Sequence, residues 1–181
     1  MENIQVLTKT NHIKKAQEKE DIMLNKERQE EVVELCQHLI QKQSYSGHED
    51  GVAGVLEEQL KKKGFDSVTV DKYGNVIGCI KGNRPGKKIL FDGHIDTVPV
   101  TDETEWQYPP FAAEIHDGKI YGRGTSDMKG AVAGFVTAAA AFAEDTKKDF
   151  AGEIYVAGVV HEECFEGVAA REISNFVKPD Y

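Results

Sequence analysis

A chain of 181 residues is long enough for one domain with a hydrophobic core, or for part of a larger domain. Hydrophobic residues make up 40% of it and charged residues 29%, a composition typical of soluble globular proteins. The formal net charge is −9 and no basic stripe is present, which argues against nucleic-acid binding, and no apolar run approaches the roughly 18 residues that a membrane-spanning helix needs.

Residues 1–26 are polar and only weakly periodic, and we expect them to form a frayed or unfolded lead-in. They contain neither an apolar signal core nor a cleavage-site pattern, so we expect a cytoplasmic protein without membrane contacts. Residues 27–181 are expected to form the folded domain.

The first strong pattern predicts two helices. Apolar residues within 27–43 fall on one stripe at helical spacing. The segment 44–51 then breaks the helix and offers Ser46 as the N-cap of a second helix, which should end at Gly64.

The pattern next changes to the period of strands. Residues 66–82 predict two strands around a turn at 73–75, and the continuously apolar segment 87–96 predicts a buried central strand. Residues 101–112 read as a loop and 114–124 as a hairpin around Asp117 and Gly118.

The last third of the chain alternates again. Residues 128–146 are rich in alanine and predict a helix, 153–163 predict a buried strand, and 166–177 predict a shorter helix. Helices and strands alternate along the whole chain, so the predicted class is a layered α/β fold. The three cysteines (Cys36, Cys79 and Cys164) are too few for a disulfide framework and are expected to be reduced and buried.

Three polar segments follow strand ends, where ligands bind in open α/β sheets. The first contains His94 and Asp96. Alternate side chains of an extended chain share a face, so His94 could bind a metal while Asp96 holds or orients a neighbouring group. A His-x-Asp pair taken alone is more often an ordinary hydrogen-bonded pair.

The second segment, 121–130, joins a strand to a helix through several glycines and carries Asp127 beside the start of the helix. Taken alone, Asp127 could be only a helix cap, and the glycine-rich segment could bind phosphate. Neither glycine-rich nucleotide fingerprint fits the segment.

The third segment carries His161, Glu162, Glu163 and Cys164 after a buried strand. Adjacent side chains point in different directions, so one acid could bind a metal while the other acts as a general base. The alternative is a solvated strand end. His161 reads as a structural or substrate-facing neighbour, and Cys164 as inert.

In this order and spacing, GHIDTVP, GRGTSDMKG and the paired glutamates resemble the dinuclear zinc exopeptidases and deacylases. That family includes acetylornithine deacetylase, succinyl-diaminopimelate desuccinylase, aminoacylase and carboxypeptidase G. The resemblance runs from about residue 28 to the end of the chain and is closest to the hydrolases linked to selenium metabolism. Other co-catalytic zinc aminopeptidases are the second choice, because they lack the Asp-Met-Lys-Gly run.

The resemblance implies a three-layer α/β/α zinc-peptidase catalytic domain with a mixed sheet, of the phosphorylase/hydrolase-like type. It implies that His94, Asp127 and Glu163 bind metal, with Asp127 bridging two ions and followed by a cis peptide bond. Glu162 would be the general base and Asp96 the carboxylate that orients His94. The implied cofactor is a pair of Zn²⁺ ions, with Co²⁺ or Mn²⁺ as alternatives, and the implied substrate is a small acylated amino acid or peptide.

The resemblance also implies parts that these residues do not supply. The family has five metal-binding side chains and this sequence offers three. A further acid is expected after the strand beginning near residues 178–181, and a further histidine much later. The lid or dimerisation domain of relatives is also missing, so a homodimer of their kind is not expected.

Three functional hypotheses follow. The first is a metal-dependent hydrolase of amide bonds, with little or no activity in this chain alone. The second is a non-catalytic remnant that pairs with a complementary C-terminal half, and the third is a metal-binding module without turnover. Trp106, Tyr108 and Phe111 could line a substrate entrance, although a packed loop is the simpler reading, and Arg123 could hold a carboxylate or form a structural ion pair.

Overall fold

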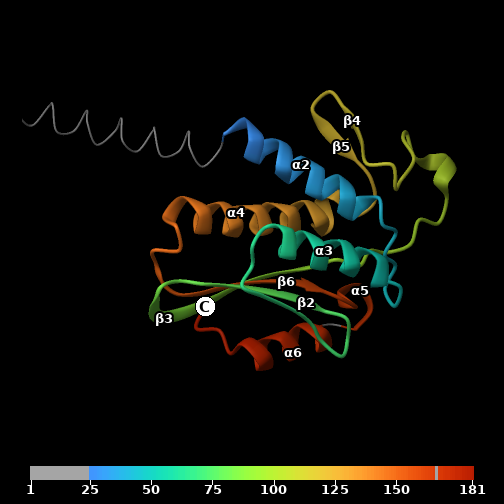
Figure 1. The fold of residues 1–181 in the computed structure, drawn as a ribbon. Helices are drawn as coiled ribbons and strands as arrows, with labels where there is room; N and C mark the ends of the chain where they lie inside the picture. The colour runs from blue at the N-terminus through green and yellow to red at the C-terminus, as the bar shows by residue number, and fades with distance from the viewer. Residues whose placement is uncertain (1–24, 166) are drawn as a thin grey trace, which may run out of the picture.

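The structure is a computed structural model that describes residues 25–165 and 167–181. In these residues a four-stranded sheet lies between helices on both faces, and Figure 1 shows α2, α3 and α4 on one side of the sheet and α6 on the other. The predicted layered α/β/α class with a mixed sheet is confirmed. The lead-in predicted for residues 1–26 lies, as far as residue 24, outside the described residues.

The N-cap residues of the first two described helices are Asn25 and Glu49. Helix α2 (Lys26–Ile40) is capped by the Asn25 side chain, which accepts a hydrogen bond from the Arg28 N–H. Helix α3 spans Asp50–Lys62, and its N-cap is Glu49, not the predicted Ser46. The prediction of Ser46 was wrong because its hydroxyl is used elsewhere, as a donor to the Asp96 carboxylate.

The sheet has the strand order β1-β2-β6-β3. Strands β1 (Ser67–Val70) and β2 (Val76–Lys81) form the predicted hairpin, and β2 pairs antiparallel with β6 (Ala151–Val159). Strand β3 (Arg84–His94) pairs with β6 in the parallel sense, with His94 opposite Val159. The carboxyl ends of β3 and β6 therefore lie side by side.

The segment containing β3 was predicted to be a central strand, and within the described sheet this is wrong. Strand β3 is at the edge, and its Phe91 side chain is 43% exposed. Backbone groups of Asp180 and Tyr181 bond to the outer side of β3, where the Leu90 N–H donates to the Tyr181 carbonyl oxygen at 3.0 Å. Continuous hydrophobicity reports burial of the faces of a strand, and it does not report how many neighbours the strand has.

The remaining elements follow the predicted order. A small hairpin joins β4 (Glu114–His116) to β5 (Lys119–Tyr121), after the short 3₁₀ turn η1 (Glu103–Glu105). Helix α4 spans Gly130–Thr146, and β6 is followed by the short α5 (Glu162–Phe165) and by α6 (Val168–Val177). The core includes Leu39, Ile40, Val52, Leu56, Leu60, Val76, Ile95, Val132, Val136 and Ile173, all at most 1% exposed.

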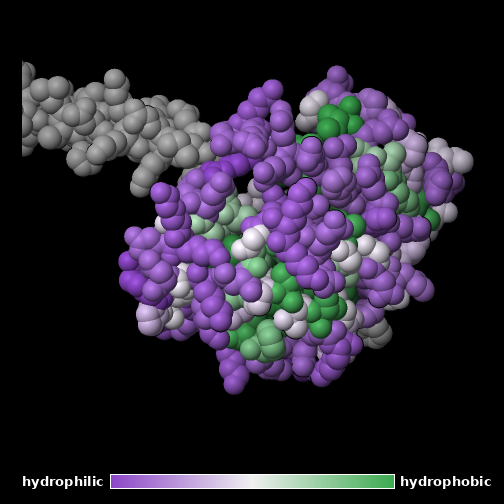
Figure 2. All heavy atoms as spheres, viewed as in Figure 1, coloured by the Kyte–Doolittle hydropathy of each residue, from purple (hydrophilic) through white to green (hydrophobic). Residues whose placement is uncertain are grey.

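The surface of the molecule is mostly polar, as the high share of charged residues in the sequence predicts. Figure 2 shows a mostly hydrophilic face, with apolar side chains gathered between α3 and α6 where the sheet is seen from its edge. Among the described residues no helix is long and apolar enough to cross a bilayer. Cys36 and Cys79 are buried and unpaired as predicted, whereas Cys164 is exposed, which corrects the expectation that all three are buried.

Close packing between α3 and the sheet gives a testable prediction. A Cβ added at Gly158 of β6 would lie 2.4 Å from a Leu56 methyl group, so Gly158→Ala should lower the free energy of unfolding by about 1–3 kcal/mol. The matched control is Gly54→Ala within α3, where nothing lies within 4 Å, and it should stabilise the protein by about 0.5–1 kcal/mol. Urea unfolding of both variants measures the difference, and equal stabilities would contradict this packing.

Candidate active site

The site is built at the paired carboxyl ends of β3 and β6. His94 is the last residue of β3, and Glu162 and Glu163 begin α5 just beyond β6. Because the two strands are parallel and in register there, the segment after each strand emerges at the same edge of the sheet. This pairing brings His94 and Glu162 together in space, although 68 residues separate them in the sequence.

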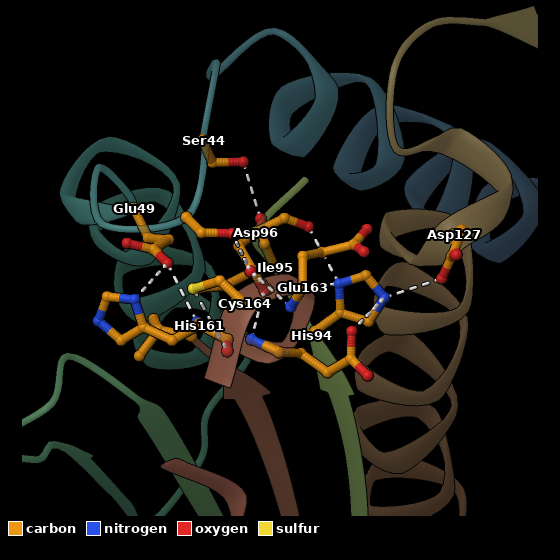
Figure 3. Close-up of polar contacts among 12 residues, drawn as sticks. Ser44, Glu49, His94, Ile95, Asp96, Asp127, His161, Glu163 and Cys164 are labelled. Carbon is orange, nitrogen blue, oxygen red and sulfur yellow. Dashed lines mark hydrogen bonds and ion pairs between the residues drawn. The ribbon is translucent and has the colours of Figure 1, made fainter. Parts of the chain in front are cut away.

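The His94 imidazole is buried, at 6% exposed, and both of its nitrogens have partners. Nδ1 lies 3.0 Å from the backbone carbonyl oxygen of Asp96 and 3.5 Å from its carboxylate, while Nε2 lies 2.8 Å from an Asp127 carboxylate oxygen (Figure 3). The Asp96 carboxylate raises the pKa of His94 to about 9, with burial opposing it and Asp127 adding to it. A ring whose Nδ1 is held by a backbone oxygen presents Nε2 outward, toward the acids around it.

Asp127 reaches His94 from the irregular turn η2 (Thr125–Lys129), which precedes α4. The Asp127–Met128 peptide bond is cis, as expected, and the backbone of both residues is non-helical. The Asp127 side chain is 79% exposed and bonds to His94, and the N-cap of α4 is Lys129. The alternative that Asp127 only caps a helix is therefore wrong.

Glu162 and Glu163 complete a cluster of acids around His94. Ligand atoms of His94, Glu162 and Glu163 all lie within 4.8 Å of one another, and a Glu162 oxygen is 4.0 Å from Nε2 of His94. In the part of the chain that the structure describes, no lysine or arginine forms an ion pair with Asp127, Glu162 or Glu163. One imidazole and several carboxylates, with no lysine or arginine paired to them among the described residues, are a donor set that divalent zinc, cobalt and manganese take, so the residues fit a metal centre.

Asp96 is fully buried beneath this cluster. Its two carboxylate oxygens accept hydrogen bonds from the Ser46 hydroxyl and from the backbone N–H groups of Glu162 (3.2 Å) and Glu163 (3.1 Å). Burial would raise the pKa of Asp96, but the bonds from His94, Ser46 and the two backbone groups outweigh burial and lower it. Asp96 thus connects the end of β3 to the turn after β6.

Three further polar residues support the site, and none of them belongs to the three polar segments that follow strand ends in the sequence. The Ser44 hydroxyl donates to the Ile95 carbonyl oxygen, the Asn75 side-chain oxygen accepts from the Val160 N–H, and the Glu49 carboxylate accepts from the His161 N–H. All three are at most 5% exposed. No local pattern marks them, because each contact spans at least 51 residues of sequence.

Lys129 is a buried cation close to the site. It is 0% exposed, and its ammonium group donates to the carbonyl oxygens of Leu39 and Lys42, both at 2.9 Å. These oxygens lie at the C-terminal end of α2, where a cation is favourable. Burial nevertheless lowers the pKa of Lys129 to about 8.

A hollow of about 370 Å³ opens beside the acids and is lined by Val98, Gly122, Arg123, Gly124, Thr125, Ser126, Asp127 and Glu163. A slightly larger hollow, of about 440 Å³, lies among charged residues of α2, α3 and α4, away from His94. We assign the site to the smaller hollow because two of the candidate ligands, Asp127 and Glu163, line it.

The loop beside this hollow is packed, as the simpler reading predicted. Tyr108 stacks on His116 with ring centres 3.8 Å apart, and Phe111 meets the edge of Tyr45. The Arg123 guanidinium lies 5.1 Å from the centre of the Trp106 ring. The structural ion pair suggested for Arg123 is not found among the described residues.

Comparison with known proteins agrees with this geometry. The model of "Peptidase family M20/M25/M40" matches residues 90–180. A succinyl-diaminopimelate desuccinylase from Roseobacter denitrificans is 36% identical over 140 residues, which are 76% of this chain and 37% of that protein. One from Beijerinckia indica is 39% identical over 132 residues, which are 69% of this chain and 34% of that protein.

Solved structures resemble the fold. An M20 family metallo-carboxypeptidase from Sulfolobus solfataricus has a TM-score of 0.71 at 27% identity, over 83% of this chain and 36% of that one. A Bacillus subtilis protein described as a dinuclear metal binding peptidase from the M20 family has a TM-score of 0.62 at 19% identity, over 83% of this chain and 40% of that one. The chain thus spans little more than a third of the length of these relatives. The family match covers half of the chain and includes His94, Asp96, Asp127, Glu162 and Glu163, so the chain belongs to peptidase family M20/M25/M40.

Proposed function

We propose that this chain carries part of the active centre of a metal-dependent hydrolase that cleaves amide bonds in peptides or N-acyl amino acids. The observation that carries the proposal is the convergence of His94, Asp127, Glu162 and Glu163 at one edge of the sheet, where no described lysine or arginine pairs with the three acids. Membership of a peptidase family and likeness to desuccinylases support the reaction class.

In this proposal the divalent ions would be held by His94, Glu163 and Asp127. The Asp127 side chain suits that role because it is exposed on one side and touches His94 on the other. When bound, such ions polarise the amide carbonyl and make water a stronger acid. Asp96 keeps Nε2 of His94 directed at the ions by holding Nδ1 and the turn at Glu162 and Glu163.

Glu162 is the proposed general base. Its carboxylate accepts a proton from the attacking water as the new carbon–oxygen bond forms, and passes that proton to the leaving nitrogen as the carbon–nitrogen bond breaks. The products are a carboxylic acid and an amine. Glu162 suits this role because its side chain is half exposed, at 51%, and its oxygen lies within 4.0 Å of Nε2 of His94.

We propose zinc as the metal, with cobalt or manganese as substitutes, since one imidazole with carboxylates accommodates all of these. Calorimetric titration with ZnCl₂ should detect binding to the purified chain, and His94→Ala should weaken the affinity at least tenfold. His38→Ala is the matched control, because His38 is exposed on α2. Equal affinities of all three proteins would contradict the assignment.

Activity is the second test. Because this chain offers three of the family's expected ligands, we expect little or no hydrolysis of N-acyl amino acids by the chain alone. Any zinc- or cobalt-dependent hydrolysis should fall at least about 100-fold in Glu162→Gln, since a general base contributes 10²–10⁴-fold. Hydrolysis that persists in this variant would contradict the proposal that Glu162 is the general base.

A second candidate is a metal-binding module that pairs with a complementary C-terminal half and has no turnover alone. The backbone bonds of Asp180 and Tyr181 along the outer side of β3 favour it, because they show that this edge of the sheet accepts further backbone pairing. Stoichiometric zinc without hydrolysis, followed by activity on adding the C-terminal half of a relative, would support this candidate.

A further inference from the structure

The turn after β6 is held by an unusual set of acceptors. Four consecutive backbone N–H groups, from Val160 to Glu163, donate to side chains from three other segments of the chain. Asn75 accepts the first, Glu49 the second and Asp96 the last two. Bonds of this kind fix the backbone from which Glu162 and Glu163 project.

Glu49 is the member of this set whose position is hardest to explain otherwise. It is the N-cap residue of α3, yet its side chain makes no capping bond to its own helix. A carboxylate that is 5% exposed carries a large desolvation cost unless it is well bonded. Its Oε1 lies 3.1 Å from the His161 backbone nitrogen and 3.4 Å from Nδ1 of the His161 ring.

The residue that Glu49 holds has a constrained backbone. His161 has φ of +60°, in the left-handed region that residues with a Cβ enter rarely and at a cost. This conformation turns the chain from β6 into α5, so it sets the direction of the two glutamates that follow. Figure 3 shows Glu49 and His161 on one side of this turn, with His94 and Asp127 on the other.

We propose that Glu49 is a positioning residue for the metal centre. By accepting the His161 N–H, it keeps the turn in the conformation that places Glu162 and Glu163 within ligand distance of His94. Asp96 fixes the same turn from the β3 side, so the two buried carboxylates act from opposite sides. The expected change in zinc affinity rests on the proposed function. The expected change in amide hydrogen exchange rests only on the structure of the turn.

The test compares two substitutions of similar size at this position. Glu49→Gln keeps an oxygen that can accept the His161 N–H, whereas Glu49→Met removes the acceptor and preserves the volume. Zinc affinity, measured by calorimetry under conditions where circular dichroism shows each protein fully folded, should fall about 10-fold or more in Glu49→Met and stay within about threefold in Glu49→Gln. Glu58→Met, at an exposed position of α3, is the control and should not change the affinity.

Hydrogen exchange measured by NMR is the second readout. The amides of His161, Glu162 and Glu163 should exchange at least tenfold faster in Glu49→Met, while the amides of β2 stay protected. A purely structural role would lower stability yet leave the zinc affinity of the folded protein unchanged, and that result would overturn the proposal. If the unmodified chain binds no zinc, the proposed function fails, and the exchange rates still decide the role of Glu49.

Glu49→Met could fail to fold, and the exchange of the His161 amide in the other two proteins then decides. Fast exchange in the unmodified chain would overturn the proposal. Slow exchange in the unmodified chain and in Glu49→Gln would support it.

Discussion

Asp96→Asn is expected to lower the free energy of unfolding by about 3 kcal/mol, because a buried acceptor for several donors is lost. Each oxygen of the Asp96 carboxylate accepts one backbone N–H, from Glu162 or from Glu163. An asparagine has a single acceptor oxygen, so in either orientation its amide group must face one of these N–H groups. The Ser46 hydroxyl can rotate to suit the change, but the backbone groups cannot.

Urea unfolding of the metal-free protein measures this loss. Asp92→Asn is the matched control, because Asp92 is exposed on the same strand, and its stability should remain within about 0.5 kcal/mol of the parent protein. A loss in Asp96→Asn no larger than that of the control would mean that Asp96 does not hold the turn.

Lys129→Ala is expected to cost about 3–5 kcal/mol. The substitution leaves the carbonyl oxygens of Leu39 and Lys42 without their donor and opens a cavity where a long side chain was fully buried. Lys129→Met should cost less, about 1–3 kcal/mol, because it fills the space and loses only the hydrogen bonds.

Thermal and urea unfolding of the two variants separate these contributions. Lys119→Met, at an exposed position of β5, is the control for removing a lysine and should leave stability nearly unchanged. If Lys129→Met were as stable as the parent protein, the two bonds to the end of α2 would contribute little, and packing alone would explain the burial of Lys129.

Periodicity in the sequence predicted most of the elements correctly. The stripe of Leu35, Cys36, Leu39 and Ile40 became the buried face of α2, and the alternation around residues 73–75 became the β1–β2 hairpin. Such patterns succeed because a helix or strand must bury one face, and the spacing of apolar residues reports that face directly.

The sequence motifs contain the acids and the histidine that meet at the site. These residues follow strand ends, and side chains at the carboxyl ends of neighbouring parallel strands can meet at one edge of a sheet. The sequence placed His94 and Glu162 each at the end of a strand, and the structure shows that these two strands are parallel neighbours. Their roles as ligands and base remain predictions, which the zinc titration and the Glu162 variant test.

The sequence by itself determined the order of the elements, the layered class and the residues that can carry chemistry. Only the tertiary structure decided that β3 lies at the edge of the described sheet, that Ser46 bonds to Asp96, and that Glu49 and Lys129 are buried. The physical reason is that periodicity is a local property, whereas the partners of a buried polar group come from distant segments. The Glu49–His161 bond spans 112 residues and the bond from Lys129 to Leu39 spans 90, so no short pattern could have shown either one.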